Sequence, residues 1–286
     1  MAKTQDLKRR IRSISNTQQL TKAMKMVSAA KLRRAQDRIL NARPYAEQTL
    51  SILRSLASRA SEESHPLLQS RVGKKALMIV VAGDKGLCGA FNSNIIRAAE
   101  DHLRVNVGDE PIQISAVGKK SSEYFKRRGY DINNSWVDLF RDIQFSHAEE
   151  IASQASELFL NGEVDRVYLA YNQFKSAIQA NPIVQPLLPI QRIEAQEGDT
   201  AEDYIYEPSA ESLLKSLLPH YVRHQIFQAL LESCAAEHAA RMTAMGNASS
   251  NASELIDSLT LTMNRVRQAS ITTDIIEVVS GAEALG

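Results

Sequence analysis

The chain has 286 residues, of which 44% are hydrophobic and 23% charged, which is ordinary for a folded protein of one or two domains. No run of eighteen apolar residues occurs, so we expect no transmembrane helix, and the first residues lack the apolar core of a signal peptide. Cys88 and Cys234 are the only cysteines, which favours a reducing compartment over a disulfide framework.

The formal net charge of +1 hides an uneven distribution. Residues 1–43 carry twelve Lys and Arg against two Asp, a net charge of +10, and the remainder of the chain is acidic overall. A segment this basic favours an acidic partner: nucleic acid, an anionic membrane surface or an acidic protein. The segment lacks the interleaved aromatic residues that favour nucleic-acid binding, since Tyr45 is the first aromatic residue of the chain. Composition alone still leaves a coiled-coil protein that binds nucleic acid as an open alternative.

Two long tracts almost free of glycine and proline predict two very long helices, because those residues end helices. The first helix is expected from about Thr4 to Ser58, with Pro44 bending it. Its apolar residues recur in steps of three and four, with one skip near Gln18, as in a coiled coil. The expected contact residues are Leu7, Ile11, Ile14, Leu20, Met24, Val27, Leu32, Ala35, Ile39, Ala42, Ala46, Leu50 and Leu53.

The middle of the chain changes its period and predicts an α/β domain with a small, mostly parallel sheet. A linker over 61–73 precedes it, with Pro66 and Gly73. Buried strands are expected at Ala76–Val81, Ile112–Val117 and Val164–Tyr171, an edge strand at Asn181–Ile190 with its three prolines, and a loop at Gln196–Tyr204. Helices are expected at Phe91–Val105, Lys119–Arg128 and His147–Leu160.

The last helix begins near Ser209 or restarts after Pro219. Its expected contact residues are small at first and larger later: Ile226, Ala229, Ser233, Ala236, Ala240, Thr243, then Leu255, Leu259, Met263 and Val266. We therefore expect Met1–Ser58 and His220–Ser280 to pair as an antiparallel coiled coil. The expected domains are a coiled-coil helix over 1–60, the linker over 61–73, a Rossmann-like α/β domain over 74–208 and a second coiled-coil helix over 209–286.

The turn Gly83–Gly89 lies between a strand and a helix, where phosphate-binding loops occur, but it matches neither of the usual glycine spacings. A structural turn is the favoured interpretation, with a small nucleotide-dependent enzyme as a second alternative. Cys88 has no histidine near it in sequence to activate its thiol, and His220 and His224 lack further metal ligands nearby. We therefore expect no catalytic, cofactor-binding or metal site.

Several short motifs, spread over almost the whole chain, resemble those of the gamma subunit of bacterial-type rotary ATP synthases. They are Asn16–Gln18, Thr21–Met24, Gln36–Arg38, Arg43–Glu47, Gly86–Gly89, Tyr204–Pro208, Glu237–Met242 and Arg267–Thr272. The resemblance implies a non-catalytic central-stalk rotor, whose rotation couples ion flow through the c ring to the catalytic cycle. It also implies a single copy per complex, with three alpha and three beta subunits, the epsilon subunit and the c ring as partners, and no nucleic acid. Its place would be peripheral, on the cytoplasmic face of the bacterial plasma (inner) membrane.

The resemblance also implies roles for individual residues. Contacts to beta subunits would come from Met24, Lys25, Lys31, Arg33, Arg34, Arg267, Gln268 and Thr272. Tyr204 and Glu207 would contact the c ring or epsilon at the foot of the stalk. The apolar end of the last helix would form a bearing tip with Ile275, Ile276, Val278, Val279 and Leu285.

Overall fold

The computed structural model describes residues 2–57, 65–71, 73, 75–107, 110–177, 179–191 and 210–283. They belong to two compact units: a helical unit formed by Met1–Ala29 with Arg241–Gly286, and an α/β unit formed by Ala30–Ala240. The two longest helices, α1 (Ala2–Ala57) and α5 (Ala210–Glu283), each contribute to both units. The units therefore divide the chain inside these helices and not at the expected domain bounds.

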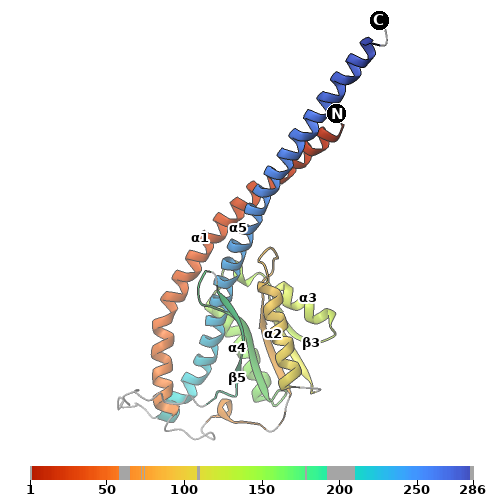
Figure 1. Cartoon of the computed structure of the whole chain (residues 1–286). Helices are drawn as coiled ribbons and strands as arrows, with labels where there is room; N and C mark the ends of the chain where they lie inside the picture. The colour runs from red at the N-terminus through yellow and green to blue at the C-terminus, as the bar shows by residue number, and fades with distance from the viewer. Residues whose placement is uncertain are drawn as a thin grey trace. The chain divides into compact units, whose positions relative to one another are not determined.

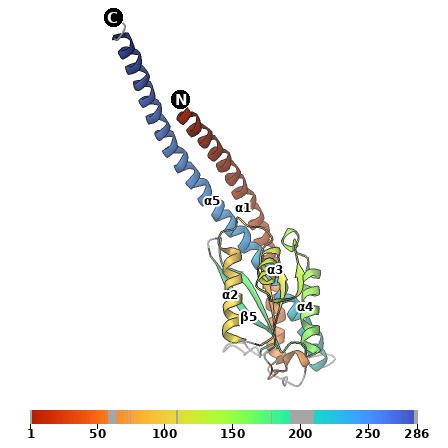
Figure 2. The same cartoon turned by 90° about the vertical axis from the view of Figure 1, so that its right-hand side faces the viewer.

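In the helical unit, the first half of α1 and the last part of α5 lie side by side and run in opposite directions (Figures 1 and 2). They come into contact at Gly246, where an added Cβ would lie 3.6 Å from the Cε atom of Lys25. In both views α5 continues past the N-terminal end of α1. The expectation of an antiparallel coiled coil is confirmed.

Some of the expected contact residues of α1 in the helical unit are wrong. Leu7, Ile11 and Ile14 are half-buried as expected, but Leu20 and Val27 are exposed, at 61% and 57%. The buried positions here are Thr21 and Ser28, which continue the spacing of seven from Leu7 and Ile14. The expected skip near Gln18 is therefore wrong, since Gln18 itself is half-buried and the contact face runs on unbroken. Small side chains at these positions allow the close helix approach seen at Gly246.

The contact face of α5 in the helical unit also differs in part from the expectation. Thr243 and Leu255 are exposed, whereas Met245 and Ala252 are buried. Their spacing of seven continues at the half-buried Leu259 and Val266, and Met263, four residues after Leu259, is also half-buried as expected. A single-residue error in phase turns a side chain by about 100°, which is enough to move it off the contact face.

The α/β unit contains a five-stranded sheet in the order β3-β2-β1-β4-β5. Its strands are β1 (Ala76–Val81), β2 (Ile112–Val117), β3 (Asp131–Trp136), β4 (Arg166–Phe174) and β5 (Ala180–Leu188). Strands β3, β2, β1 and β4 pair with one another in parallel, and β5 pairs antiparallel with β4 at the edge. The expected mostly parallel sheet, with its proline-rich edge strand, is confirmed.

Helices cover both faces of this sheet. Successive side chains of β1 point to opposite faces, and each set packs against helices. Met78 and Val80 pack in a core with α2 (Phe91–Asn106) and α3 (Lys119–Arg127). Leu77 and Ile79 pack on the other face with α4 (Phe145–Leu160) and with the first part of α5. Helix α5 is therefore also one of the covering layers of the sheet.

Three elements of the α/β unit were not expected from the sequence. Strand β3 was missed because its sequence is polar and only alternate residues are partly buried, as suits an edge strand. Within the expected linker over 61–73, the short 3-10 helix η2 (Pro66–Leu68) places Leu67 in the core, and the Leu67 carbonyl accepts a hydrogen bond from Ile190 N–H. A second 3-10 helix, η3 (Leu139–Arg141), follows β3.

The middle of α5 is buried on all sides. Every residue from 229 to 239 is buried, although the stretch includes Glu232, Glu237 and His238. On one side it faces the sheet, and Ile39 and Ala42 of α1 pack against the same core. Small side chains such as Ala235 and Ala236 make this crowding possible, which confirms the expected small-residue face.

The turn between β2 and α3 requires glycine at position 118. Gly118 has a φ of +87°, and an added Cβ would lie 2.1 Å from the Ala82 carbonyl oxygen. We predict that Gly118→Ala lowers the free energy of unfolding by on the order of 3 kcal/mol or more, because backbone must move to relieve the clash. Chemical denaturation of the chain measures this cost.

Gly129 is the matched control, because it has a φ of +79° but no atom within 4 Å of an added Cβ. Gly129→Ala should cost only about 1 kcal/mol, the strain of a left-handed alanine. Equal costs for the two variants would show that the contact with Ala82 is not what fixes this glycine.

Candidate functional site

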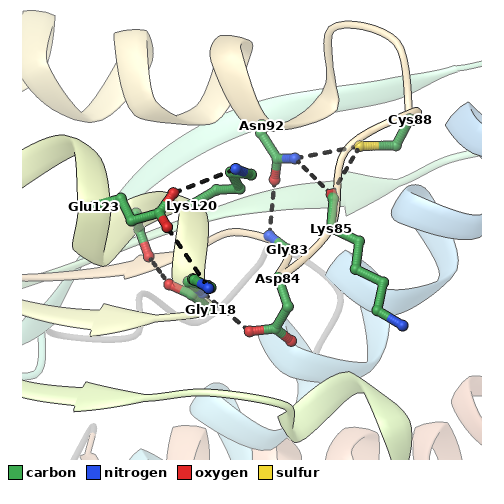
Figure 3. Close-up of polar contacts among 10 residues, drawn as sticks. Gly83, Asp84, Lys85, Cys88, Asn92, Gly118, Lys120 and Glu123 are labelled. Atoms are coloured by element: carbon green, nitrogen blue, oxygen red, sulfur yellow. Dashed lines mark hydrogen bonds and ion pairs between the residues drawn. The ribbon is translucent and has the colours of Figure 1, made fainter.

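The glycine turn after β1 is held together by its own side chains (Figure 3). Asn92 accepts a hydrogen bond from Gly83 N–H at 2.8 Å, and its amide group donates to the Lys85 carbonyl at 3.2 Å and to the Cys88 sulfur at 3.2 Å. The first N–H of the turn is therefore occupied within the protein.

The start of α3 is attached to the same turn (Figure 3). Asp84 accepts a hydrogen bond from Lys119 N–H at 3.0 Å, and Lys120 N–H donates to the Gly83 carbonyl at 3.1 Å. The Lys120 ammonium group is paired with Glu123 at 3.3 Å. A phosphate at this turn would have to displace these contacts.

The turn also faces the side chain of Glu237 on α5. An added Cβ at Gly83 would lie 3.2 Å from the carboxyl carbon of Glu237, a side chain that is only 4% exposed. Cys88 and Phe91 pack against Ala236 on the same helix. Glycine at 83 thus lets the turn approach α5 closely, and the Glu237 side chain lies directly against it. The geometry supports the structural interpretation of this turn and not the nucleotide-dependent enzyme.

A shallow cavity of about 560 Å³ lies between α2 and α3, next to the turn. Its charged side chains are partly neutralised by one another: Glu100 accepts hydrogen bonds from Tyr124 at 2.9 Å and from Arg128 at 3.3 Å. The bond to Glu100 and burial raise the pKa of Tyr124. The cavity carries no group arranged for acid–base or nucleophilic chemistry.

Leu87 combines a backbone conformation and an exposure that the sequence did not reveal. It has a φ of +62°, in the left-handed region, and its side chain is 65% exposed. Left-handed backbone is unfavourable for leucine, and exposure gives no compensating burial. The network around Asn92 holds the turn that presents this side chain. No local signal beyond its position between glycines could have identified it.

The basic residues expected to contact beta subunits are all exposed along α1. In the α/β unit, Lys31, Arg33 and Arg34 surround the buried Leu32 and leave the outer arc of the helix positively charged. In the helical unit, Lys25 lies across Gly246 of α5, and the neighbouring Met24 is half-buried. Each of these ammonium and guanidinium groups can be reached by a carboxylate on another protein.

The expected contact residues near the end of α5 are exposed as well. Arg267 and Gln268 point into solvent, and the Thr272 hydroxyl donates a hydrogen bond to the Gln268 carbonyl at 3.0 Å. All residues from 271 to 282 are exposed, including the aliphatic residues expected at the tip. Those described are Ile275, Ile276, Val278 and Val279.

Three of the expected site residues, Tyr204, Glu207 and Leu285, lie outside the described residues, as does the expected loop Gln196–Tyr204. Among the described residues, His220 and His224 stack near Phe145, and no group of three or more His, Cys, Asp or Glu side chains is arranged around a common metal position. Burial lowers the pKa of His224. None of the described helices combines the length and apolarity needed to cross a membrane.

These features define a class of protein. The Rossmann-like α/β unit shares its core with parts of two long helices, which expose basic side chains along α1 and aliphatic side chains near the end of α5. Exposed surfaces of these kinds are typical of a protein that binds other proteins.

The comparisons with known proteins identify the family. The family model described as ATP synthase matches residues 3–285. ATP synthase gamma chains of Pelotomaculum thermopropionicum and Anaeromyxobacter dehalogenans are each 50% identical to this chain, with all of both chains covered. That of Heliobacterium modesticaldum is 47% identical over 98% of each chain.

Solved structures show the same similarity to chains of ATP synthases. The central stalk of the Tetrahymena thermophila mitochondrial ATP synthase contains a chain 31% identical, with a TM-score of 0.61, covering 80% of this chain and 99% of its own length. A chain of the Euglena gracilis mitochondrial ATP synthase has the same fold, with a TM-score of 0.73 at 20% identity, and 99% and 95% of the two chains are covered.

The chain belongs to the family of ATP synthase gamma chains. It is a non-catalytic subunit of the central stalk, as the resemblance implied. This result favours the stalk interpretation of the basic helix over the nucleic-acid-binding alternative.

We predict that Leu87→Gly slows ATP turnover by the assembled enzyme while barely changing the stability of the chain. Glycine relieves the left-handed strain of the folded state but raises the backbone entropy of the unfolded state. The two effects oppose each other, so the free energy of unfolding should change by less than about 1 kcal/mol. A lost aliphatic contact contributes about 1 kcal/mol, or roughly a fivefold change in rate. ATPase assays and chemical denaturation test both parts. Val137→Gly, at another exposed aliphatic residue of the α/β unit, is the control, and equal turnover in both variants would contradict a contact role for Leu87.

Proposed function

We propose that this chain is the rotor of an ion-translocating ATP synthase, with the helical unit inside a ring of three alpha and three beta subunits. In this proposal the α/β unit contacts the epsilon subunit and the c ring, one copy is present per complex, and the complex lies at the cytoplasmic face of the plasma membrane. The chain would touch the membrane only through the complex.

The observation that carries the proposal is the exposed end of α5. From residue 271 to 282 the helix has no buried side chain, yet it displays Ile271, Ile275 and three further aliphatic residues. An isolated helical end of this kind is marginal in water, and an exposed aliphatic cluster favours association. A surrounding sleeve of other subunits supplies the missing cover.

Apolar contact suits a bearing. Burial of aliphatic surface is non-directional, so the helix end can turn within a sleeve without breaking specific bonds at each angle. Just before this tip, Arg267, Gln268 and Thr272 offer directional polar groups. In the proposal these form contacts with beta subunits that break and re-form with each third of a turn.

The basic part of α1 provides a second contact with beta subunits. Lys25, Lys31, Arg33 and Arg34 would face acidic segments of these subunits, and the half-buried Met24 would lie at the same level. Charge complementarity on an exposed surface steers and orients a partner more than it adds affinity. It therefore suits contacts that must be exchanged during rotation.

The coupling mechanism follows from the uneven surface. At any angle the rotor presents basic residues to one beta subunit and apolar or neutral residues to the others, so the three catalytic sites experience different contacts. A contact that favours one conformation shifts the population of that subunit towards it. Rotation moves this bias from site to site, so each site passes in turn through binding, synthesis and release.

We predict that reversing three basic charges together, Lys31→Glu, Arg33→Glu and Arg34→Glu, lowers the number of ions pumped per ATP hydrolysed. One exposed ion pair contributes only about 0–1 kcal/mol, so Arg33→Gln alone should have a mild effect. Lys25 is left unchanged because it also packs on Gly246.

The control reverses three exposed basic residues on the helices of the α/β unit, Arg104, Lys126 and Arg127. It makes the same change in net charge and should leave the pumping ratio unchanged. A wild-type ratio in the triple variant of α1 would rule out its role.

We predict that a cysteine at position 204 forms a disulfide with a cysteine in the polar loop of a c subunit, because Tyr204 and Glu207 are proposed to be at the foot of the stalk. The measurement is cross-linked product in the assembled complex after mild oxidation. A cysteine at position 271, near the other end of α5, should give no such product. Failure of position 204 to cross-link in an active complex would contradict the assignment.

We predict that Arg267→Ala and Gln268→Ala slow turnover without preventing assembly. Each lost polar contact contributes roughly 1 kcal/mol, which corresponds to about a fivefold slower rate. Removal of the last few residues should be tolerated better, because smooth apolar contact is spread over several side chains. Arg265→Ala, an exposed arginine two residues earlier, is the control. Wild-type rates of ATP hydrolysis and synthesis in both point variants would exclude the proposed polar contacts.

A further inference from the structure

Strand β4 is longer than the strand beside it. Its pairing with β1 ends at Ala170, opposite Val80, whereas β4 continues to Phe174. Backbone N–H groups alternate in direction along a strand, so those of Asn172 and Phe174 point to the same side. Beyond the end of β1, that side of β4 needs other hydrogen-bond acceptors.

Two consecutive side chains of α5 provide these acceptors. The Ser233 hydroxyl oxygen accepts a hydrogen bond from Asn172 N–H at 3.1 Å, and the Glu232 carboxylate accepts one from Phe174 N–H at 3.3 Å. Ser233 is 0% exposed and Glu232 is 7% exposed, so both bonds lie in the protein interior. Helix α5 thus completes the hydrogen bonding of the sheet at this point.

The second oxygen of Glu232 is also occupied, by the side-chain amide of Gln228 at 2.8 Å. Burial raises the pKa of the Glu232 carboxyl, and the bonds from Gln228 and Phe174 oppose this rise. A buried carboxyl group is costly, and an apolar side chain of similar volume would avoid the cost. Stability alone therefore does not account for a glutamate here.

Two further polar links of α5 in the α/β unit, to α4 and to β5, differ in kind. Arg223 pairs with Glu149 of α4 at 3.1 Å, but the two side chains are 31% and 50% exposed. Gln225 accepts a hydrogen bond from Gln185 of β5 at 3.2 Å, from side chain to side chain. Exposed pairs of long side chains hold a position weakly. The bonds from Glu232 and Ser233 instead join the helix directly to strand backbone.

We propose that Glu232 and Ser233 are positioning residues that lock α5 to the end of β4 and keep the α/β unit from slipping along or around this helix under torque. The inference rests on the proposed function, in which force from the c ring enters through the α/β unit. The apolar contacts around Ala229 and Ala236 are weakly directional. Hydrogen bonds from strand backbone to the side chains of Glu232 and Ser233 are directional, so they fix the register that apolar packing leaves adjustable.

The test uses the complete ATP synthase assembled with the variant chain. The double variant Glu232→Leu with Ser233→Ala removes both acceptors while preserving most of the volume. We expect amide hydrogen exchange at residues 172–174 to accelerate roughly fivefold or more for each lost bond. We expect ATP hydrolysis to stay near the wild-type rate while the number of ions pumped per ATP falls. Glu232→Gln, which keeps an acceptor oxygen, should restore most of the ratio.

Arg223→Gln is the control, because it removes an exposed link from α5 to a different element, α4, and should leave the ratio unchanged. If the double variant does not assemble, Ser233→Ala alone, which removes one oxygen, should still give a smaller loss of pumping. Faster exchange with an unchanged pumping ratio would overturn the proposal. Two other results would also overturn it, because each indicates a purely structural role. One is a lower yield of assembled complex whose pumping ratio is normal, and the other is failure of Ser233→Ala to assemble.

The same preparations separate this inference from the proposed function. The substitution Tyr204→Cys is introduced into the otherwise unchanged chain and, separately, into the double variant. Cross-linking of each to the c subunit is then measured. A cross-link together with an unchanged pumping ratio refutes the lock and leaves the foot contact intact. Absence of the cross-link in the otherwise unchanged chain refutes the foot contact, whatever the exchange rates show.

Discussion

Burial of the middle of α5 is the constraint on which the rest of the α/β unit depends. From 229 to 239 every residue is buried, because the sheet, the glycine turn and α1 all pack against this stretch. A helix enclosed in this way must be lined with small residues and must satisfy its polar groups internally. Ala236 and Ser233 meet the first requirement, and the bonds from β4 to Glu232 and Ser233 help to meet the second. The stalk helix and the sheet therefore share one core.

This shared core explains why a turn that resembles a phosphate loop binds no phosphate in our interpretation. The sequence Gly83–Gly89 lies at the end of a parallel strand, the usual place for such a loop. In this chain the position in front of it is taken by Glu237, and its first N–H is bonded to Asn92. The glycines allow the turn to approach α5, so the motif serves attachment of the stalk helix and not nucleotide binding.

The helical unit, unlike the middle of α5, leaves much of its surface exposed. Its helices bury only narrow contact faces, and residues 271–282 bury nothing within the chain. Leu20 and Val27 are left on the outside of α1 together with many basic side chains. Such a surface is unfavourable for a free protein but suits one that works inside a ring of other subunits. The chain thus combines a region whose contacts are complete with a region whose contacts must come from partners.

The sequence by itself determined the elements and the family. The apolar runs of β1 and β2 defined both strands to the residue, and the tracts free of glycine and proline defined α1 and α5, because local spacing encodes local structure. Only the tertiary structure decided what these elements touch. It placed Thr21 and Ser28 on the contact face in place of Leu20 and Val27, paired the polar strand β3 at the sheet edge, and joined Glu232 to β4. These features depend on the phase and position of a partner element far away in the sequence, and no local pattern contains that information.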